Sequence, residues 1–249
     1  MLAVLKDSIK LIREGYGAKI DLAHLPIDDP TVYQTLCKAD TIGMFQIESR
    51  AQMSCLPRLK PVCFYDLVVE IAIIRPGPIV GKMVHPYLNR RQGREPVTYP
   101  HPSLKPILER TLGVPIFQEQ LLRIAMVAAG FNGGEAEELR RAFGFKRPKE
   151  KMNAIEARLR QGMADRGITG ETQSQIAESI KSFALYGFPE SHAASFALIA
   201  YASAYIKCHH LAAFTAAILN NQPLGFYSPA TLVKDAQRHG LLVKPIHIG

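Results

Sequence analysis

The chain has no tryptophan and little cysteine. Its four cysteines are scattered, with no Cys-x-x-Cys pair, at Cys37, Cys55, Cys63 and Cys208. A chain of 249 residues can bury a real core without disulfides, so we expect reduced thiols of the kind found in a cytosol. His209 and His210 follow Cys208, but a zinc site is not expected because no second ligand pair stands at zinc spacing. Flat side chains for stacking must come from tyrosine and phenylalanine.

Long uncharged apolar runs are also absent. The segment Ala193 to Ile206 is the longest in its helix, and it is shorter than the about 20 residues that cross a bilayer. Lys6 and Asp7 interrupt the apolar start, which is therefore not a signal peptide. We expect a soluble, cytoplasmic chain with no membrane partner. Repeats, low-complexity tracts and Gly/Ser linkers are missing as well.

Two catalytic patterns are not found in the sequence. Ser191 and His192 are neighbours, but no Gly-x-Ser-x-Gly elbow surrounds them, which argues strongly against a hydrolase. No Asp-x-Asp occurs, and the adjacent Asp28 and Asp29 stand before Pro30, where a helix cap explains them. Because two-metal catalysis needs converging carboxylates, we expect no catalytic metal in this chain.

Apolar spacing predicts a mainly α-helical chain with a few short strands. Leu2, Leu5, Ile9 and Ile12 follow a helical period. Asp29 and Pro30 are typical of a helix start, and further helical patterns follow in 63–74, 83–93, 115–130, 133–144, 148–167, 171–187, 193–209, 211–220 and 228–240. The stretch TIGMFQIES, residues 41–49, indicates a short strand.

A first basic cluster follows Leu139. Glu150 is the one acid among six basic residues: Arg140, Arg141, Lys146, Arg147, Lys149 and Lys151. Such a cluster concentrates positive potential on one surface, which suits a polyanion. The alternative is a solvated helix surface on which Arg141 pairs with Glu137 at i, i+4. That pairing would account for the two arginines but not for the cations that follow them.

A second basic cluster precedes Glu95 and contains Arg75, Lys82, Arg90, Arg91 and Arg94. It is interleaved with the turn-forming sequence RPGP, and rigid turns that hold arginines suit contacts to phosphates. A plain basic surface loop is an equally good interpretation. The formal net charge of +8 permits nucleic acid, acidic lipid or another polyanion as a partner.

The segment ALYGFPESHAASFALIAY raises a third possibility. A helix that begins near Ser191 offers N–H groups and partial positive charge to an anion. Tyr186 and Phe188 offer flat faces, and together these features suit a nucleoside triphosphate or a base pair. The alternative is structural: Ser191 caps the helix and His192 packs in its first turn.

Several motifs, in this order, resemble one family: FQIESRAQMSCLPRLKPVCFYDLVVEIAIIRPGP, PIFQEQLLRIA, ELRRAFG and YGFPESHAASFALIAY. They are similar to the fingers region of the bacterial C-family DNA polymerases, the alpha subunits of DNA polymerase III. PESHAAS and the ending LNNQPLGFYSPATLVKDAQRHG resemble the error-prone, damage-inducible branch. The resemblance covers nearly the whole chain. In one departure, FGFKRP stands where the family has MGKK or a similar sequence after the double arginine.

The resemblance implies a helical fingers region over residues 1–249 and two sets of site residues. Incoming dNTP would be bound by Arg140, Arg141, Lys146, Tyr186, Phe188, Ser191 and His192. Primer-template DNA would be bound by Arg75, Lys82, Arg90, Arg91, Arg94 and Arg147.

The resemblance also implies that this chain is a fragment. The PHP and palm regions would precede it, the palm aspartates would hold Mg²⁺, and helix-hairpin-helix and OB-type regions would follow. We therefore expect the chain alone to be inactive as a DNA-directed DNA polymerase. Partners would include the rest of the polymerase and, through those other regions, the sliding clamp and mutasome accessory proteins. Two alternatives are a stand-alone, non-catalytic DNA-binding module and a non-functional remnant of a truncated polymerase gene.

Overall fold

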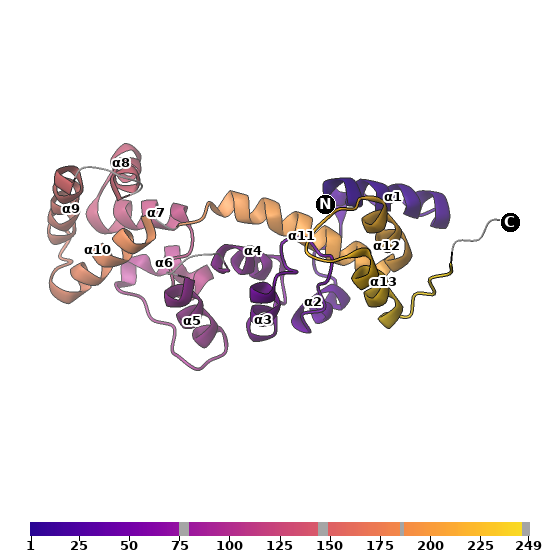
Figure 1. Cartoon of the computed structure of the whole chain (residues 1–249). Coiled ribbons are helices and arrows are strands. Elements are labelled where there is room, and N and C mark those ends of the chain that lie inside the picture. The colour runs from indigo at the N-terminus through magenta and orange to yellow at the C-terminus, as the bar shows by residue number, and fades with distance from the viewer. Residues whose placement is uncertain (75–79, 144–148, 185–186, 246–249) are drawn as a thin grey trace. The chain divides into compact units, whose positions relative to one another are not determined.

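The computed structural model describes residues 1–74, 80–143, 149–184 and 187–245. These ranges hold thirteen α-helices, three short 3-10 helices and one isolated bridge between Phe117 and Phe188 (Figure 1). The prediction of a mainly helical fold is confirmed. The chain divides into two compact units, one of Met1–Ile71 with Ala194–Gly249 and one of Ala72–Ala193.

The first unit is built around a cluster of apolar side chains from its N- and C-terminal helices. Val4, Leu5 and Ile12 of α1 are buried in the same cluster as Phe214 and Ile218 of α12. Leu2, which the helical period also pointed inward, is instead exposed. The unit contains α1 (Leu2–Tyr16), η1 (Leu22–His24), α2 (Pro30–Cys37), α3 (Arg50–Leu59), most of α4 (Phe64–Ile73) and of α11 (Glu190–His209), α12 (Leu211–Asn220) and α13 (Pro229–Arg238).

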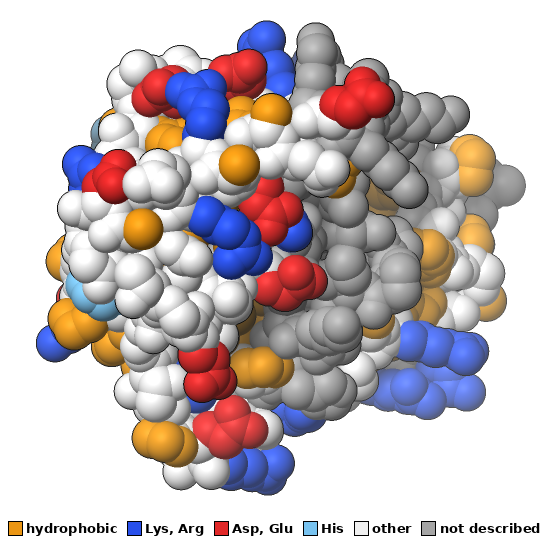
Figure 2. Space-filling view, turned by 90° about the vertical axis from the view of Figure 1, so that its left-hand side faces the viewer, with side chains coloured by type: hydrophobic (Ala, Val, Ile, Leu, Met, Phe, Trp, Pro, Cys, Tyr) orange, Lys and Arg blue, Asp and Glu red, His pale blue; other side chains and the backbone are white. Residues whose placement is uncertain are grey.

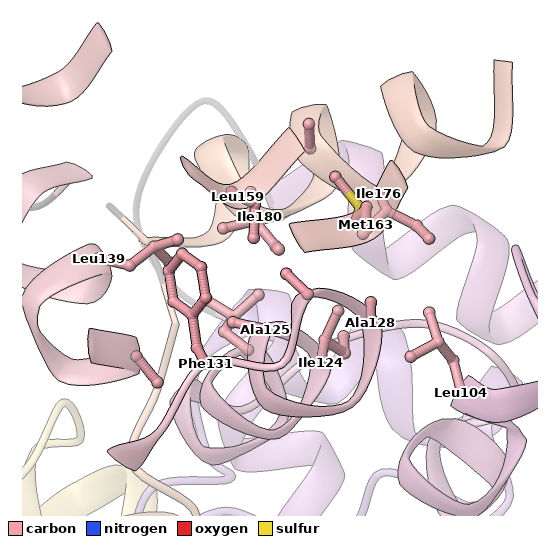
Figure 3. Close-up of a cluster of buried hydrophobic side chains, with 14 of the residues drawn as sticks. Leu104, Ile124, Ala125, Ala128, Phe131, Leu139, Leu159, Met163, Ile176 and Ile180 are labelled. Atoms are coloured by element: carbon pink, nitrogen blue, oxygen red, sulfur yellow. The ribbon is translucent and has the colours of Figure 1, made fainter. Parts of the chain in front are cut away.

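The second unit packs several helices around α7. Figure 3 shows Ile124, Ala125 and Ala128 of α7 facing Leu139 of α8 and Ile180 of α10, and all of these side chains are buried. Its elements are α5 (Val80–Arg91), η2 (Pro102–Leu104), α6 (Lys105–Leu108), η3 (Glu109–Thr111), α7 (Gln118–Ala129), α8 (Gly133–Phe143), α9 (Lys149–Ala164) and α10 (Gly170–Ala184). This core is the scaffold on which the candidate site residues are placed.

Helix ends follow the local chemistry that the sequence indicates. The Asp29 carboxylate accepts hydrogen bonds from the Thr31 and Val32 amides at 2.8 and 3.3 Å, with Pro30 in the first turn of α2. Gly130, at φ 71°, ends α7 in the left-handed region that glycine adopts without strain. Capping and breaking residues therefore located these two helix ends from sequence alone.

The predicted strand at residues 41–49 is wrong. Turns occupy this segment, and Gly43 and Gln46 have φ values of 77° and 65°. Two left-handed residues three positions apart prevent the extended backbone of a strand. Met44 and Ile47 are both buried, a spacing that a strand's alternation would not give. The Thr41 hydroxyl instead donates a hydrogen bond to the Ile47 carbonyl at 2.6 Å and closes the loop.

Glu70 in α4 is a carboxyl with no exposed surface, in the first unit. Among the described residues, neither of its carboxylate oxygens has a partner at hydrogen-bonding distance. Burial raises the pKa of Glu70 to about 8, and the neighbouring Cys55 thiol offsets only part of this rise. The folded chain thus holds a proton on Glu70 at pH values where the unfolded chain has lost it.

Because the folded chain binds this proton more tightly than the unfolded chain does, we expect the free energy of unfolding to fall as the pH rises from about 4.5 to about 8. Neutral Glu70 contributes fully to the stability of the fold below the ordinary glutamate pKa. This contribution is lost as the pH approaches the folded-state pKa. Glu70→Gln should remove this component, which urea unfolding at several pH values can measure. Glu14→Gln, at an exposed position of α1, is the control. An equal pH dependence for the wild type and Glu70→Gln would contradict the prediction.

Candidate functional site

The segment before α11 and the first turn of α11 carry four of the predicted nucleotide-binding residues. The Ala193 amide donates to the Pro189 carbonyl at 3.0 Å, so Pro189 and not Ser191 occupies the N-cap position. Ser191 lies inside the first turn, and the predicted cap is wrong for that reason. Ser191 and His192 are exposed, and the His192 ring centroid lies 5.3 Å from that of Phe188. The structure thus brings Phe188 and His192 together, whereas Tyr186 lies outside the described residues.

The first turn of α7 is bonded to this segment. The Gln118 amide donates to the Phe188 carbonyl at 3.1 Å, and the Gln118 Nε2 donates to the Gly187 carbonyl at 2.7 Å. One residue further on, the Glu119 Oε2 accepts from the Glu190 amide at 3.0 Å. A carboxylate therefore already occupies one of the N–H groups that the start of α11 would offer to an anion.

Gln118 and Glu119 were not among the residues predicted from sequence. Both belong to the motif PIFQEQLLRIA, but about 70 residues separate them from the segment that they contact. Their one local signal is their place in the first turn of a helix, where polar side chains often bond nearby backbone. Sequence spacing alone gives no way to find their partners.

Arg140 and Arg141, at the end of α8, share one carboxylate. Glu137 accepts hydrogen bonds from Arg140 Nε at 2.8 Å and Nη2 at 2.7 Å, and from Arg141 Nε at 2.9 Å. These hydrogen bonds, with Arg140 contributing most, lower the pKa of Glu137 to about 2. The predicted pairing of Arg141 with Glu137 is confirmed. The carboxylate holds both guanidinium groups at the last turn of α8, with the Arg141 side chain 64% exposed.

Acidic and basic side chains alternate on the face formed by this part of the second unit, as Figure 2 shows. Arg160 and Lys181 both pair with Glu156, at 3.0 and 2.5 Å. Arg158 pairs with Glu135. Of the first basic cluster, Lys146 and Arg147 lie outside the described residues, as do the side chains of Lys149 and Lys151. Their predicted contribution to a positive surface stays a prediction.

In the second basic cluster Arg90 has an internal role. Its Nη1 donates to the Leu112 carbonyl at 2.7 Å and the Thr98 carbonyl at 3.3 Å, and its Nη2 donates to Thr98 Oγ1 at 3.1 Å. Gly113, at φ 79°, leaves room for this guanidinium, because a Cβ there would lie 2.5 Å from Arg90 Nη1. Arg90 thus connects two loops of the second unit. If it also contacts DNA, as predicted, it must do so while it makes these internal hydrogen bonds.

Arg91 and Arg94 are the other members of this cluster with described side chains. The Arg91 side chain is half-buried and that of Arg94 is exposed. Arg75 and the side chain of Lys82 lie outside the described residues. Among the described side chains expected to contact DNA, that of Arg94 is therefore the exposed one, whereas those of Arg90 and Arg91 are half-buried.

One group in the first unit could hold a metal ion by distance alone. Among the described residues, ligand atoms of Asp40, Asp235 and His239 lie within 4.8 Å of one another. The Lys207 ammonium, however, lies 2.8 Å from Asp235 and 3.9 Å from Asp40. The Asp40 hydrogen bond raises the pKa of His239 and so favours a second cation there. Because these charges already compensate the two carboxylates, we interpret the group as an ion-pair network that joins α11 to α13.

The residues Cys208, His209 and His210 do not converge on one point. The Cys208 thiol contacts Thr35 Oγ1 at 3.5 Å, whereas the His209 Nε2 lies 2.8 Å from the Asp29 carboxylate. His210 faces the ring of Tyr16 instead. These separate partners do not make a metal site. None of the described helices combines the length and apolar character needed to cross a membrane.

Comparisons with known proteins find the same similarity along the whole chain. A family model of the bacterial DNA polymerase III alpha subunit finger domain matches residues 1–167. The error-prone DNA polymerase of Methylococcus capsulatus is 55% identical over 248 residues, which cover 100% of this chain and 24% of that protein. That of Anaeromyxobacter dehalogenans is 59% identical over 228 residues, covering 92% and 20%. The chain thus spans about a quarter of the length of the relatives it matches.

Proposed function

Because the chain belongs to the family of bacterial DNA polymerase III alpha subunit finger domains, we propose that it binds dNTP and primer-template DNA within an error-prone DNA polymerase. The observation that carries the proposal is the identity of 55% to one such polymerase over the full chain. Such a polymerase would act in DNA damage tolerance, in the cytoplasm. The remainder of the polymerase would be the chief partner, and the sliding clamp and mutasome accessory proteins would bind through other regions.

Two groups of residues would carry out the binding in the second unit. Arg140 and Arg141 would reach the triphosphate, since a guanidinium forms paired hydrogen bonds with phosphate oxygens. Phe188 and His192 would border the nascent base pair with their adjacent rings. Ser191, Lys146 and Tyr186 would join this surface, while Arg75, Lys82, Arg90, Arg91, Arg94 and Arg147 would contact the DNA backbone.

Chemistry would come from carboxylates outside this chain. Phosphodiester formation uses Mg²⁺, which in two-metal sites is bound by several converging acidic side chains. The Asp40 and Asp235 carboxylates do not fit that role, since the Lys207 ammonium already lies 3.9 Å from the first and 2.8 Å from the second. This chain would instead contribute position and charge around the substrate, which are large parts of phosphoryl-transfer catalysis.

We expect the purified chain to bind primer-template DNA weakly, without sequence preference and with strong dependence on salt. Binding to phosphates releases counterions, so the affinity should fall about tenfold or more between about 50 and 200 mM salt. Fluorescence anisotropy with labelled duplexes of two unrelated sequences measures both properties. Binding that ignores salt, or no binding at low ionic strength, would contradict the polyanion interpretation.

Arginine-to-alanine variants can test which residues contact the DNA backbone. Each arginine that contacts a phosphate should reduce the slope of log affinity against log salt by about one when it becomes alanine. Arg91→Ala with Arg94→Ala should therefore flatten the slope by about two. Arg13→Ala, at an exposed position in α1 of the first unit, is the matched control and should leave the slope nearly unchanged.

A further inference from the structure

The segment 187–190 is held in place by one end of α7. Phe188 forms the isolated bridge with Phe117, the one bridge in the described part of the chain. Three hydrogen bonds accompany it: two from Gln118, to the carbonyls of Phe188 and Gly187, and one from the Glu190 amide to Glu119. Gly187, Phe188 and Glu190 are thus held by three successive residues at the start of α7.

The start of α7 is itself rigidly anchored. Phe117 is fully buried, and the Gln120 side chain is buried as well. Gln120 Oε1 accepts from the amides of Ile116 and Phe117 at 2.8 and 3.0 Å. Its Nε2 donates to the Ile107 carbonyl and to Thr111 Oγ1 at 3.1 and 2.8 Å. Since a buried, fully bonded side chain strongly resists movement, Gln118 and Glu119 extend from a fixed support.

The Glu119 contact also determines what the start of α11 can bind. A carboxylate at a helix N-terminus is favoured by the N–H groups and the partial positive charge there. Because the Glu119 carboxylate is bonded to the Glu190 amide, a triphosphate at this amide would have to displace that negative charge or lie close to it. The rings of Phe188 and His192, rather than the helix end, remain as the feature that this segment can present to a nucleotide.

We infer that Gln118 and Glu119 are positioning residues that hold the 187–190 segment, and with it the Phe188–His192 ring pair, at the nucleotide surface. The inference rests on the proposed function, because it assigns that ring pair to the nucleotide. Gln118 fixes the segment through two backbone carbonyls, and Glu119 fixes the beginning of the helix that carries His192. Neither side chain needs to touch the substrate.

The test uses the Methylococcus capsulatus polymerase with its matching segment replaced by this chain. In it, Glu119→Ala should raise the KM for dNTP about tenfold, since a hydrogen bond to a charged group contributes about that factor. Gln118→Ala removes one neutral hydrogen bond and keeps the backbone one, so it should raise this KM by about threefold. Both variants should change kcat less and leave the primer-template affinity unchanged. Glu119→Gln keeps an acceptor oxygen and should restore most of the loss. Glu178→Ala, at an exposed position of α10, is the matched control.

Hydrogen exchange supplies a second measurement that does not depend on activity. Peptides that cover the amides of Gln118 and Glu190 should exchange about tenfold faster in Glu119→Ala than in the wild type or Glu178→Ala. Unchanged exchange at both amides would overturn the inference and leave the proposed function intact. Faster exchange with an unchanged KM for dNTP would instead overturn the proposed nucleotide role of this segment.

Discussion

Replacing Arg140 or Arg141 by alanine should lower kcat/KM for dNTP by about ten- to a hundredfold in a polymerase that carries this chain. A hydrogen bond between a charged donor and a phosphate contributes about 1.5–3 kcal/mol, and its loss would appear when the nucleotide is used. Affinity for primer-template DNA should change little, because the proposal assigns the template to other cations. Single-nucleotide incorporation in the Methylococcus capsulatus chimera measures the first quantity, and anisotropy measures the second.

The geometry of α8 supports a functional as well as a structural role for these arginines. Glu137 bonds Nε and Nη2 of Arg140, so Nη1 takes no part in that pair. The shared carboxylate fixes two guanidinium groups side by side before any ligand arrives, which lowers the entropy cost of binding phosphate. If the pair were only a helix-surface ion pair, its removal would have a small effect on stability and none on kinetics.

Arg160→Ala is the matched control for this experiment. Arg160 makes the same kind of i, i+4 ion pair, with Glu156 at 3.0 Å in α9 of the same unit. Its loss should leave kcat/KM for dNTP within about twofold of the wild type. Wild-type kinetics in both the Arg140 and Arg141 variants would reduce these arginines to surface charges. A folded chimera that binds DNA but incorporates no nucleotide would favour the alternative of a DNA-binding module.

The parts of the fold that sequence predicts well are those governed by neighbours along the chain. Asp29 and Pro30 begin α2, and Gly130 ends α7, because capping and left-handed turns depend on a few adjacent residues. For the segment 41–49, the same kind of local pattern predicted a strand and was wrong. The shape of this segment depends on the Ser203 hydroxyl, which accepts from the Phe45 amide at 3.0 Å and stands 158 residues away.

The candidate site divides in the same way. Glu137 lies one turn from Arg141, so a spacing rule predicts their pair, and the structure adds that Arg140 shares it. The internal bonds of Arg90 were not predictable, since a basic cluster in a turn-rich segment looks the same whether its arginines bind loops or phosphates. Nor was the contact of Glu119 with Glu190, which depends on how α7 and the start of α11 are brought together.

Gly162→Ala should lower the free energy of unfolding by about 1–3 kcal/mol. Gly162 lies within α9, and a Cβ at this position would stand 2.1 Å from the backbone carbonyl oxygen of Ala129, the last residue of α7. The obstacle is backbone, which cannot rotate away as a side chain can, so the two helices would have to separate within a close-packed core.

Helix propensity alone predicts the opposite sign, and this makes the experiment decisive. Alanine is about 1 kcal/mol more favourable than glycine inside a helix. Gly133→Ala, in the first turn of α8, is the matched control because no heavy atom lies within 4 Å of the added Cβ. It should leave stability unchanged or raise it. Urea unfolding of both variants, followed by circular dichroism, compares them directly, and a Gly162→Ala chain as stable as the wild type would show that α7 and α9 do not depend on this close approach.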